Sequence, residues 1–132
     1  MSVTRWSLTL AILACLVPAF ADAQGGARLT PLVAGWERFF IVTSETVQRG
    51  GGARVLGYVG NEAGFKASRV RILIDGLDAS GQIVDQTIWW IGSPGPGPGG
   101  RVAFDAPAPA GARHRVSVFS YDWVQSAMFD AP

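Results

Sequence analysis

The feature that most constrains the fold is a strict alternation of apolar and polar residues within short segments. The clearest such segment runs from Ser68 to Asp75. Its three β-branched residues alternate with three charged ones, in the pairs Arg69 and Val70, Arg71 and Ile72, Ile74 and Asp75. Successive side chains of a strand point to opposite faces of a sheet, so this period of two predicts a strand with its β-branched residues buried and its arginines in water. A one-residue slip would bury both arginines, which fixes the register.

The rest of the chain repeats this pattern between turn-forming residues, and no segment has sustained helical periodicity. Further strands are expected at Glu37–Thr46, Arg54–Asn61, Gln82–Ile91, Arg101–Asp105 and Arg113–Trp123. The separators are rich in residues that favour turns and loops: Gly50-Gly51-Gly52, the hairpin turn Asp78-Ala79-Ser80-Gly81, the Pro/Gly segment Gly92–Gly100 and the loop Ala106–Ala112. Short strands at this spacing predict an all-β fold. We expect a two-layer antiparallel sandwich of about six or seven strands, of the immunoglobulin or fibronectin type III kind.

The N-terminus has the composition of a secretory signal. Arg5 supplies the positive charge, Trp6 to Ala21 carries none, and Ala21-Asp22-Ala23 has small residues where a signal peptidase requires them. The apolar stretch is too short and interrupted to be expected to span a bilayer, which takes about 20 residues. We therefore predict cleavage after Ala23 and a periplasmic or secreted protein. The expected organisation is a signal peptide at 1–23, a lead-in at 24–35, a β-sandwich domain at 36–125 and a tail at 126–132.

The only cysteine of the chain, Cys15, lies in this signal, so the mature chain has no internal disulfide. Ile12-Leu13-Ala14-Cys15 loosely resembles a bacterial lipobox, which leaves a lipid anchor at Cys15 as an alternative to simple cleavage. Ordinary cleavage is the preferred interpretation. Leu13 is bulkier than a lipobox favours, and the residues that follow Cys15 remain apolar.

The charge balance gives no argument for a nucleic-acid partner or an anionic membrane. Removing Arg5 and Asp22 from the 11 basic and 10 acidic residues leaves ten and nine, a net charge of +1. Such a balance creates no long-range field that would attract a polyanion.

Part of the chain is similar to a known family. Val55-x-Gly57-x-Val59-x-Asn61 is followed by Val70-x-Ile72-x-Ile74 and then by Leu77-Asp78-Ala79-Ser80-Gly81-x-x-Val84, with Pro98-Gly99 before Phe104. Over about Val55 to Phe104 this resembles the FxLYD type of small bacterial exported β-sandwich domain, with Ile74, Gly76 and Leu77 in place of that family's Phe, Leu and Tyr. The resemblance implies an immunoglobulin-like fold and export, and it supplies no catalytic residue.

The residues that carry chemistry are few. His114 is the only histidine, there is no Gly-x-Ser-x-Gly motif, and no cysteine remains in the mature chain. Asp75, Asp78 and Asp85 lack the spacing of a calcium loop. In Gly95-x-Gly97-x-Gly99 the intervening prolines have no N–H for a phosphate. We therefore predict no catalytic, cofactor or metal site, and a protein that is not an enzyme.

The tryptophans and neighbouring aromatic residues are the remaining candidates for binding. Because Val84, Ile88 and Trp90 share one parity, we expect Trp90 in the core and Trp89 outward. Phe119, Tyr121 and Trp123 have the opposite parity to Val116 and Val118. Either a β-bulge near Phe119 turns these aromatic side chains inward, or they form an exposed strip.

Together these observations predict a non-catalytic exported interaction or structural module with an unknown protein partner. The alternative is a carbohydrate-binding module that contacts a glycan through Trp89, Tyr121 and Trp123. The competing interpretation of these side chains is structural, with packing against Trp36 and the lead-in.

Overall fold

The computed structural model describes residues 28–91 and 99–124. This part of the chain has a single 3₁₀ turn and six strands: η1 (Trp36–Arg38), β1 (Phe40–Arg49), β2 (Gly52–Asn61), β3 (Ala67–Leu77), β4 (Ile83–Trp90), β5 (Arg101–Pro107) and β6 (Arg113–Trp123). The expected signal peptide with Cys15, most of the Pro/Gly segment and the expected tail lie outside the described residues.

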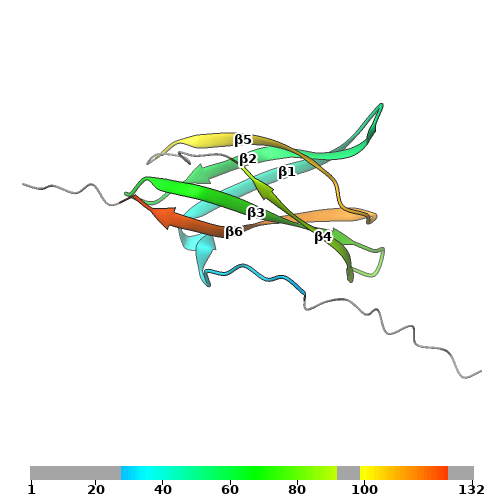
Figure 1. The fold of residues 1–132 in the computed structure, drawn as a ribbon, viewed down its shortest axis with the longest axis horizontal. Coiled ribbons are helices and arrows are strands. Elements are labelled where there is room, and N and C mark those ends of the chain that lie inside the picture. Colours follow the sequence, from blue (N-terminus) through cyan, green and yellow to red (C-terminus); the bar gives the residue numbers. More distant parts are fainter. Residues whose placement is uncertain (1–27, 92–98, 125–132) are drawn as a thin grey trace, which may run out of the picture.

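The strands form two antiparallel three-stranded sheets, one ordered β1-β2-β5 and the other β4-β3-β6. Figure 1 shows the sheets as two layers, with β3 between its two partners. The all-β architecture and the six expected strand segments are confirmed, although some bounds differ. Gly52, expected in a turn, begins β2, and β5 continues to Pro107, within the expected loop. The first strand differs most. Trp36–Arg38 forms the 3₁₀ turn, and β1 begins only at Phe40.

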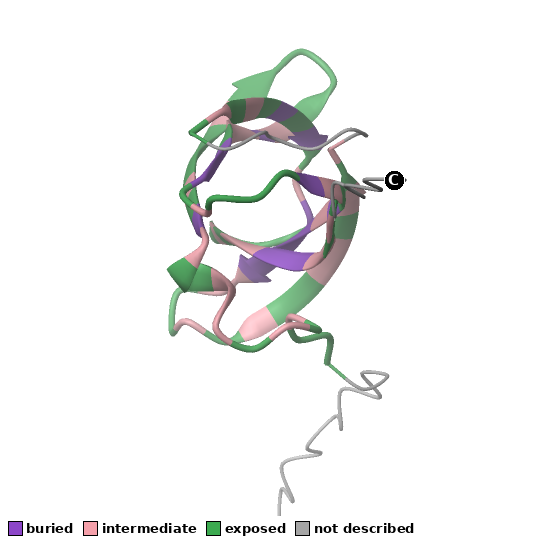
Figure 2. Cartoon of the chain, turned by 90° about the vertical axis from the view of Figure 1, so that its left-hand side faces the viewer, coloured by how far each residue is buried: buried purple, intermediate pink, exposed green. Residues whose placement is uncertain are grey.

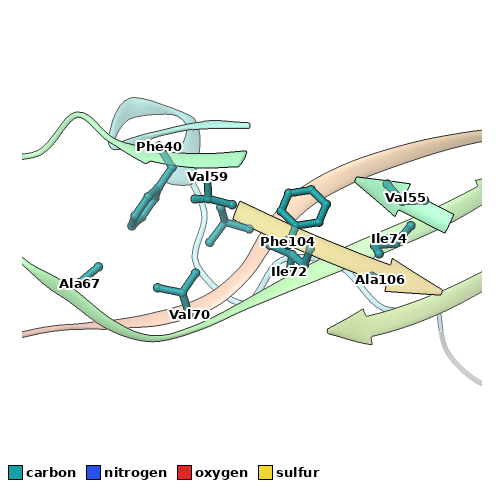
Figure 3. Close-up of a cluster of buried hydrophobic side chains, with 10 residues drawn as sticks. Phe40, Val55, Val59, Ala67, Val70, Ile72, Ile74, Phe104 and Ala106 are labelled. Atoms are coloured by element: carbon teal, nitrogen blue, oxygen red, sulfur yellow. The ribbon is translucent and has the colours of Figure 1, made fainter. Parts of the chain in front are cut away.

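The inner faces of the two sheets enclose one apolar core. Its fully buried side chains come from both layers and point toward one another in Figure 3: Phe40, Val55, Val59, Ala67, Val70, Ile72, Ile74 and Ala106. Phe104 and Val118 complete the buried cluster. The end-on view of Figure 2 shows buried segments in both layers. The prediction that Val70, Ile72 and Ile74 of β3 face inward is confirmed, because all three are fully buried. Their removal from water drives the two layers together.

Two irregularities in the β3–β6 ladder change the parity of both strands. Arg69 has a φ of 49°, and the register advances by an extra residue on β3 between Ser68 and Arg71. On β6 the extra residue is Phe119, because Arg71 pairs with Ser120 whereas Ile72 pairs with Val118. Of the two alternatives for this strand, the bulge near Phe119 is therefore the one present. It allows residues of opposite parity on β6 to face the same core.

The described part of the N-terminal lead-in, residues 28–35, crosses the outer face of the second sheet, and it runs below β6 and β4 in Figure 1. The backbone N–H of Leu32 donates to the Phe119 carbonyl at 2.8 Å. The Gln86 side-chain amide accepts from the Leu29 N–H and donates to the Leu29 carbonyl, both at 2.9 Å. On this face Leu73 is only 1% exposed although it does not belong to the core cluster. The second sheet is thus buried on both sides along part of its length.

Asp75 corrects one expectation. The alternation of β3 places it on the same face as Arg69 and Arg71, which is predicted to face water, yet it is only 4% exposed. Arg115 donates to Oδ2 of Asp75 from Nε at 3.1 Å and from Nη2 at 2.8 Å. Gln86 donates to Oδ1 at 2.8 Å. A buried carboxylate is tolerated when it is paired and hydrogen-bonded in this way.

The β3–β4 turn is the hairpin predicted from its sequence. Oδ1 of Asp78 accepts from the Ser80 N–H at 2.9 Å, the Ser80 hydroxyl at 2.6 Å and the Gln82 N–H at 2.9 Å. Gly81 has a φ of 87°, a conformation that costs glycine little. The Ser80 hydroxyl and the Gln82 N–H hold the pKa of the Asp78 carboxyl below its ordinary value.

We predict that Asp78→Asn removes a pH-dependent part of the stability. A carboxyl whose pKa is lowered by folding stabilises the native state above its unfolded pKa of about 4, and this contribution is lost as the pH falls through the folded value. In urea titrations, the wild type should exceed Asp78→Asn at pH 7 and approach it in strong acid. A difference that does not vary with pH would contradict this role of the charge.

A second prediction concerns Gly76, where an added Cβ would overlap the carbonyl oxygen of Ala110. Gly76→Ala should lower the free energy of unfolding by about 1–3 kcal/mol, the usual cost of overpacking. Gly64→Ala is the matched control, since no atom lies within 4 Å of its added Cβ. Equal urea midpoints for both variants would show that the β5–β6 loop does not press on β3.

Candidate binding groove

The register of β3 and β4 decides which tryptophan is exposed. Ile72 pairs with Trp89 and Arg71 pairs with Trp90. Because Ile72 faces the core, Trp89 faces it too and packs against the buried cluster. Trp90 is 50% exposed on the outer face. The expectation that Trp90 is buried and Trp89 points outward is therefore wrong. The even-numbered positions of β4 hold most of its apolar residues, including Val84 and Ile88, and these side chains are exposed.

Tyr121 and Trp123 face the interior at one end of the sandwich. Their rings belong to an aromatic cluster with rings of β1, the residue before β1 and the β2–β3 connection: Phe39, Phe40 and Phe65. Trp123 stacks on Phe40 at 5.8 Å and meets Tyr121 edge-on at 5.0 Å. Burial raises the pKa of the Tyr121 phenol. These contacts are structural in kind, since edge-on and offset stacked rings stabilise a core.

The structure places a groove on the outer face of the second sheet, beside the lead-in. It is open to solvent and encloses about 460 Å³. The lead-in contributes Leu32 and Val33, and the strands contribute Arg69, Arg71, Trp90, Ser120, Tyr121 and Asp122. Of the three side chains predicted to contact a ligand, the groove includes Tyr121 and neither Trp89 nor Trp123.

Arg71 lies in the middle of this groove and is held from two sides. Its Nε donates to the Ser120 hydroxyl at 2.8 Å, and its guanidinium carbon lies 5.3 Å from the centre of the Phe119 ring. In the part of the chain that the structure describes, no carboxylate pairs with Arg71. Arg69, by contrast, is paired with Asp122. The groove therefore carries one fixed positive charge with no countercharge.

A second hollow of about 460 Å³ lies over the first sheet, and its lining has two carboxylates, Glu45 and Asp105, and one guanidinium, that of Arg49. Arg49 and Arg54 both pair with Asp105 there. Arg101 lies over the exposed ring of Tyr58, at 5.4 Å.

The residues first considered for catalysis or metal binding lie elsewhere and are engaged in local contacts. His114 donates from Nε2 to the Pro109 carbonyl at 2.7 Å, and its Nδ1 lies 2.9 Å from the Thr46 hydroxyl. Oδ2 of Asp85 accepts from the Ala110 N–H at 2.9 Å. Within residues 28–91 and 99–124, no three His, Cys, Asp or Glu side chains gather as metal ligands would. The groove offers the indole of Trp90, the guanidinium of Arg71 and the hydroxyl of Ser120, which are groups for binding.

Sequence reasoning overlooked Arg71, Trp90 and Ser120. The outward position of Arg71 was visible in the alternation of β3. That Trp90 and Ser120 flank it follows only from the pairing of β3 with β4 and β6.

No family model, curated protein or solved structure matches this chain. No helix among the described residues is long and apolar enough to span a bilayer. The role of the groove is therefore inferred from its own side chains.

The two adjacent tryptophans give a direct test of the register. Trp89→Ala should destabilise the fold by about 2 kcal/mol or more, because it leaves a cavity against the core. Trp90→Ala should cost less than about 1 kcal/mol, as surface substitutions usually do. Urea denaturation followed by circular dichroism measures both. The reverse order of stabilities would contradict the observed pairing of β3 with β4.

Proposed function

We propose that this chain is an exported, non-catalytic binding module with an immunoglobulin-like or fibronectin type III-like sandwich. Its binding surface is the outer face of β4-β3-β6. The observation that carries this proposal is the combination, on one face, of Arg71, which has no ion pair among the described residues, with the exposed apolar side chains of Ile88 and Trp90. Large apolar side chains that are exposed together on one face mark interaction sites.

The strand order supports the proposed sandwich type. Immunoglobulin-type domains place strands A, B and E in one sheet and C and F in the other, where variable-type domains add C′. Taken in chain order, β1-β2-β5 corresponds to A-B-E and β4-β3-β6 to C′-C-F. The FxLYD resemblance supports the same fold, and together with the features of the first 23 residues it supports export.

β4 gives the proposed surface a second means of contact. It is an edge strand of its sheet, so one side of its backbone has no neighbouring strand among the residues that the structure describes. Natural edge strands are usually protected by lysine or proline, and β4 contains neither.

Carbohydrate binding is the second candidate, and the exposed indole of Trp90 favours it. An aromatic ring combines a broad apolar face with low conformational entropy, and this suits it to contact a sugar ring. In this version of the proposal Trp90 replaces Trp89 as the contact residue.

The proposed surface is tested by carbene footprinting of the protein in intact cells and after purification. Labelling of Ile88 and Trp90 should fall several-fold in cells, where the ligand or partner covers them. Labelling of Ile41 and Tyr58, which are exposed on the other sheet, serves as the control and should not change. Labelling of Ile88 and Trp90 that is the same in cells and after purification would contradict the proposed surface.

Export is tested separately. N-terminal sequencing of the exported product should give Gln24 as the first residue, because cleavage is predicted after Ala23.

A further inference from the structure

We propose that the groove beside Trp90 binds a carboxylated pyranose unit of an acidic polysaccharide, with Arg71 receiving the carboxylate and Trp90 stacking on the sugar ring. This inference rests on the proposed binding function and adds the chemical class of the ligand. It depends on three features of the groove: the state of Arg71, the position of Trp90 and the polar groups at the rim.

Arg71 is prepared for a planar anion. The hydrogen bond from Nε to Ser120 and the Phe119 ring beneath the guanidinium fix its orientation before any ligand arrives. No acceptor within the described residues occupies its two terminal nitrogens. A guanidinium presents its donors in a planar fork that matches a carboxylate with two parallel hydrogen bonds. Because the side chain is already ordered, binding requires little further loss of conformational entropy.

Trp90 is the immediate neighbour of Arg71 across the β3–β4 ladder. Directly opposed side chains on one face of an antiparallel pair have Cβ atoms about 4.5–5.5 Å apart. A ligand that lies on the exposed indole can therefore place a carboxylate on the guanidinium. A uronate ring has this arrangement, since its carboxylate is attached to the ring whose C–H groups face the indole.

The rest of the groove suits the hydroxyl groups of a sugar. Arg69 and Asp122 form an exposed ion pair at the rim and offer both donors and acceptors. Leu32 and Val33 of the lead-in add apolar surface to the lining. A volume of about 460 Å³ falls within the range of small-ligand sites.

The charges favour an acidic sugar over a neutral one. Arg69, Arg71 and Asp122 line the groove, and after the Arg69–Asp122 pair is counted the charge of Arg71 remains. The hollow on the other sheet, by comparison, has one arginine in its lining, Arg49, which is paired with Asp105, and a further carboxylate, that of Glu45.

The experiment measures binding of the mature protein to three probes by isothermal titration calorimetry. Oligogalacturonate carries both the ring and the carboxylate, a neutral dextran oligomer carries only rings, and poly-L-glutamate carries carboxylates without rings. We expect oligogalacturonate to bind at least about tenfold more tightly than either of the others. Equal binding of poly-L-glutamate would assign the groove to acidic peptides, and equal binding of dextran would remove Arg71 from recognition. Either result would overturn the inference.

Variants then assign the binding to the groove. Arg71→Gln and Trp90→Ala should each weaken oligogalacturonate binding at least about tenfold. Arg71→Lys, which keeps the charge and loses the fork, should lie between Arg71→Gln and the wild type. Arg101→Gln and Tyr58→Ala are the matched controls on the opposite face. Tyr58 is as exposed as Trp90, at 50%. Because both control residues lie on the other sheet, away from the groove, their substitution should change the affinity less than twofold.

Thermal unfolding of each variant separates a binding defect from a folding defect, and Trp90→Ala is available if Arg71→Gln does not fold. Unchanged affinity in folded Arg71→Gln or Trp90→Ala, or no binding of oligogalacturonate at all, would overturn the ligand assignment. If Ile88 and Trp90 are still protected in cells in that case, the binding surface itself stands. Loss of protection as well would end the proposed function.

Discussion

The burial of three β-branched side chains on β3 determines most of this structure. β3 is the central strand of its sheet, and Val70, Ile72 and Ile74 are fully buried. β3 pairs with both β4 and β6, and directly paired residues of neighbouring strands point to the same side of the sheet. The orientation of each β3 residue therefore sets that of its partners on both neighbours. Ile72 brings Trp89 into the core on one side and Val118 on the other. The same register places Arg71 on the outside between Trp90 and Ser120, so the core and the groove are two consequences of one alternation.

The outer face of this sheet is more than the solvent side of a sandwich. Leu73, Phe119 and Asp75 are all buried there, and the lead-in is attached by the Gln86 amide and by the Leu32 N–H. Two hydrogen bonds of the Gln86 side chain, one to Asp75 and one to Leu29, connect a buried carboxylate with the backbone of the lead-in. Because unsatisfied buried polar groups are costly, removal of the lead-in would affect Gln86 and Asp75 as well as the apolar residues. The lead-in therefore belongs structurally to the second sheet, and it helps to form the groove.

The sequence was sufficient to predict the strands whose two faces differ in composition. β3 has β-branched residues on one face and arginines on the other, so its orientation followed at once. β4 has a tryptophan on each face, and the face with more aliphatic residues is the exposed one; only its pairing partners decide between them. Asp75 appeared solvated because its coverage comes from Arg115 and Gln86, which are 40 and 11 residues away in the chain. The bulge at Phe119 could be proposed from a parity conflict, whereas its counterpart at Arg69 left no such signal.

A net charge near zero makes long-range attraction of a polyanion weak, but it does not prevent selective binding at short range. Coulomb interactions between exposed groups fade beyond a Debye length of about 8 Å at physiological ionic strength. Four arginines of the described chain, Arg49, Arg54, Arg69 and Arg115, form an ion pair with a carboxylate. Arg71 instead has a hydroxyl and an aromatic ring, which orient a guanidinium without neutralising it. The selectivity of such a surface depends on where one uncompensated charge lies relative to an exposed indole, and the pairing of β3 with β4 sets that distance.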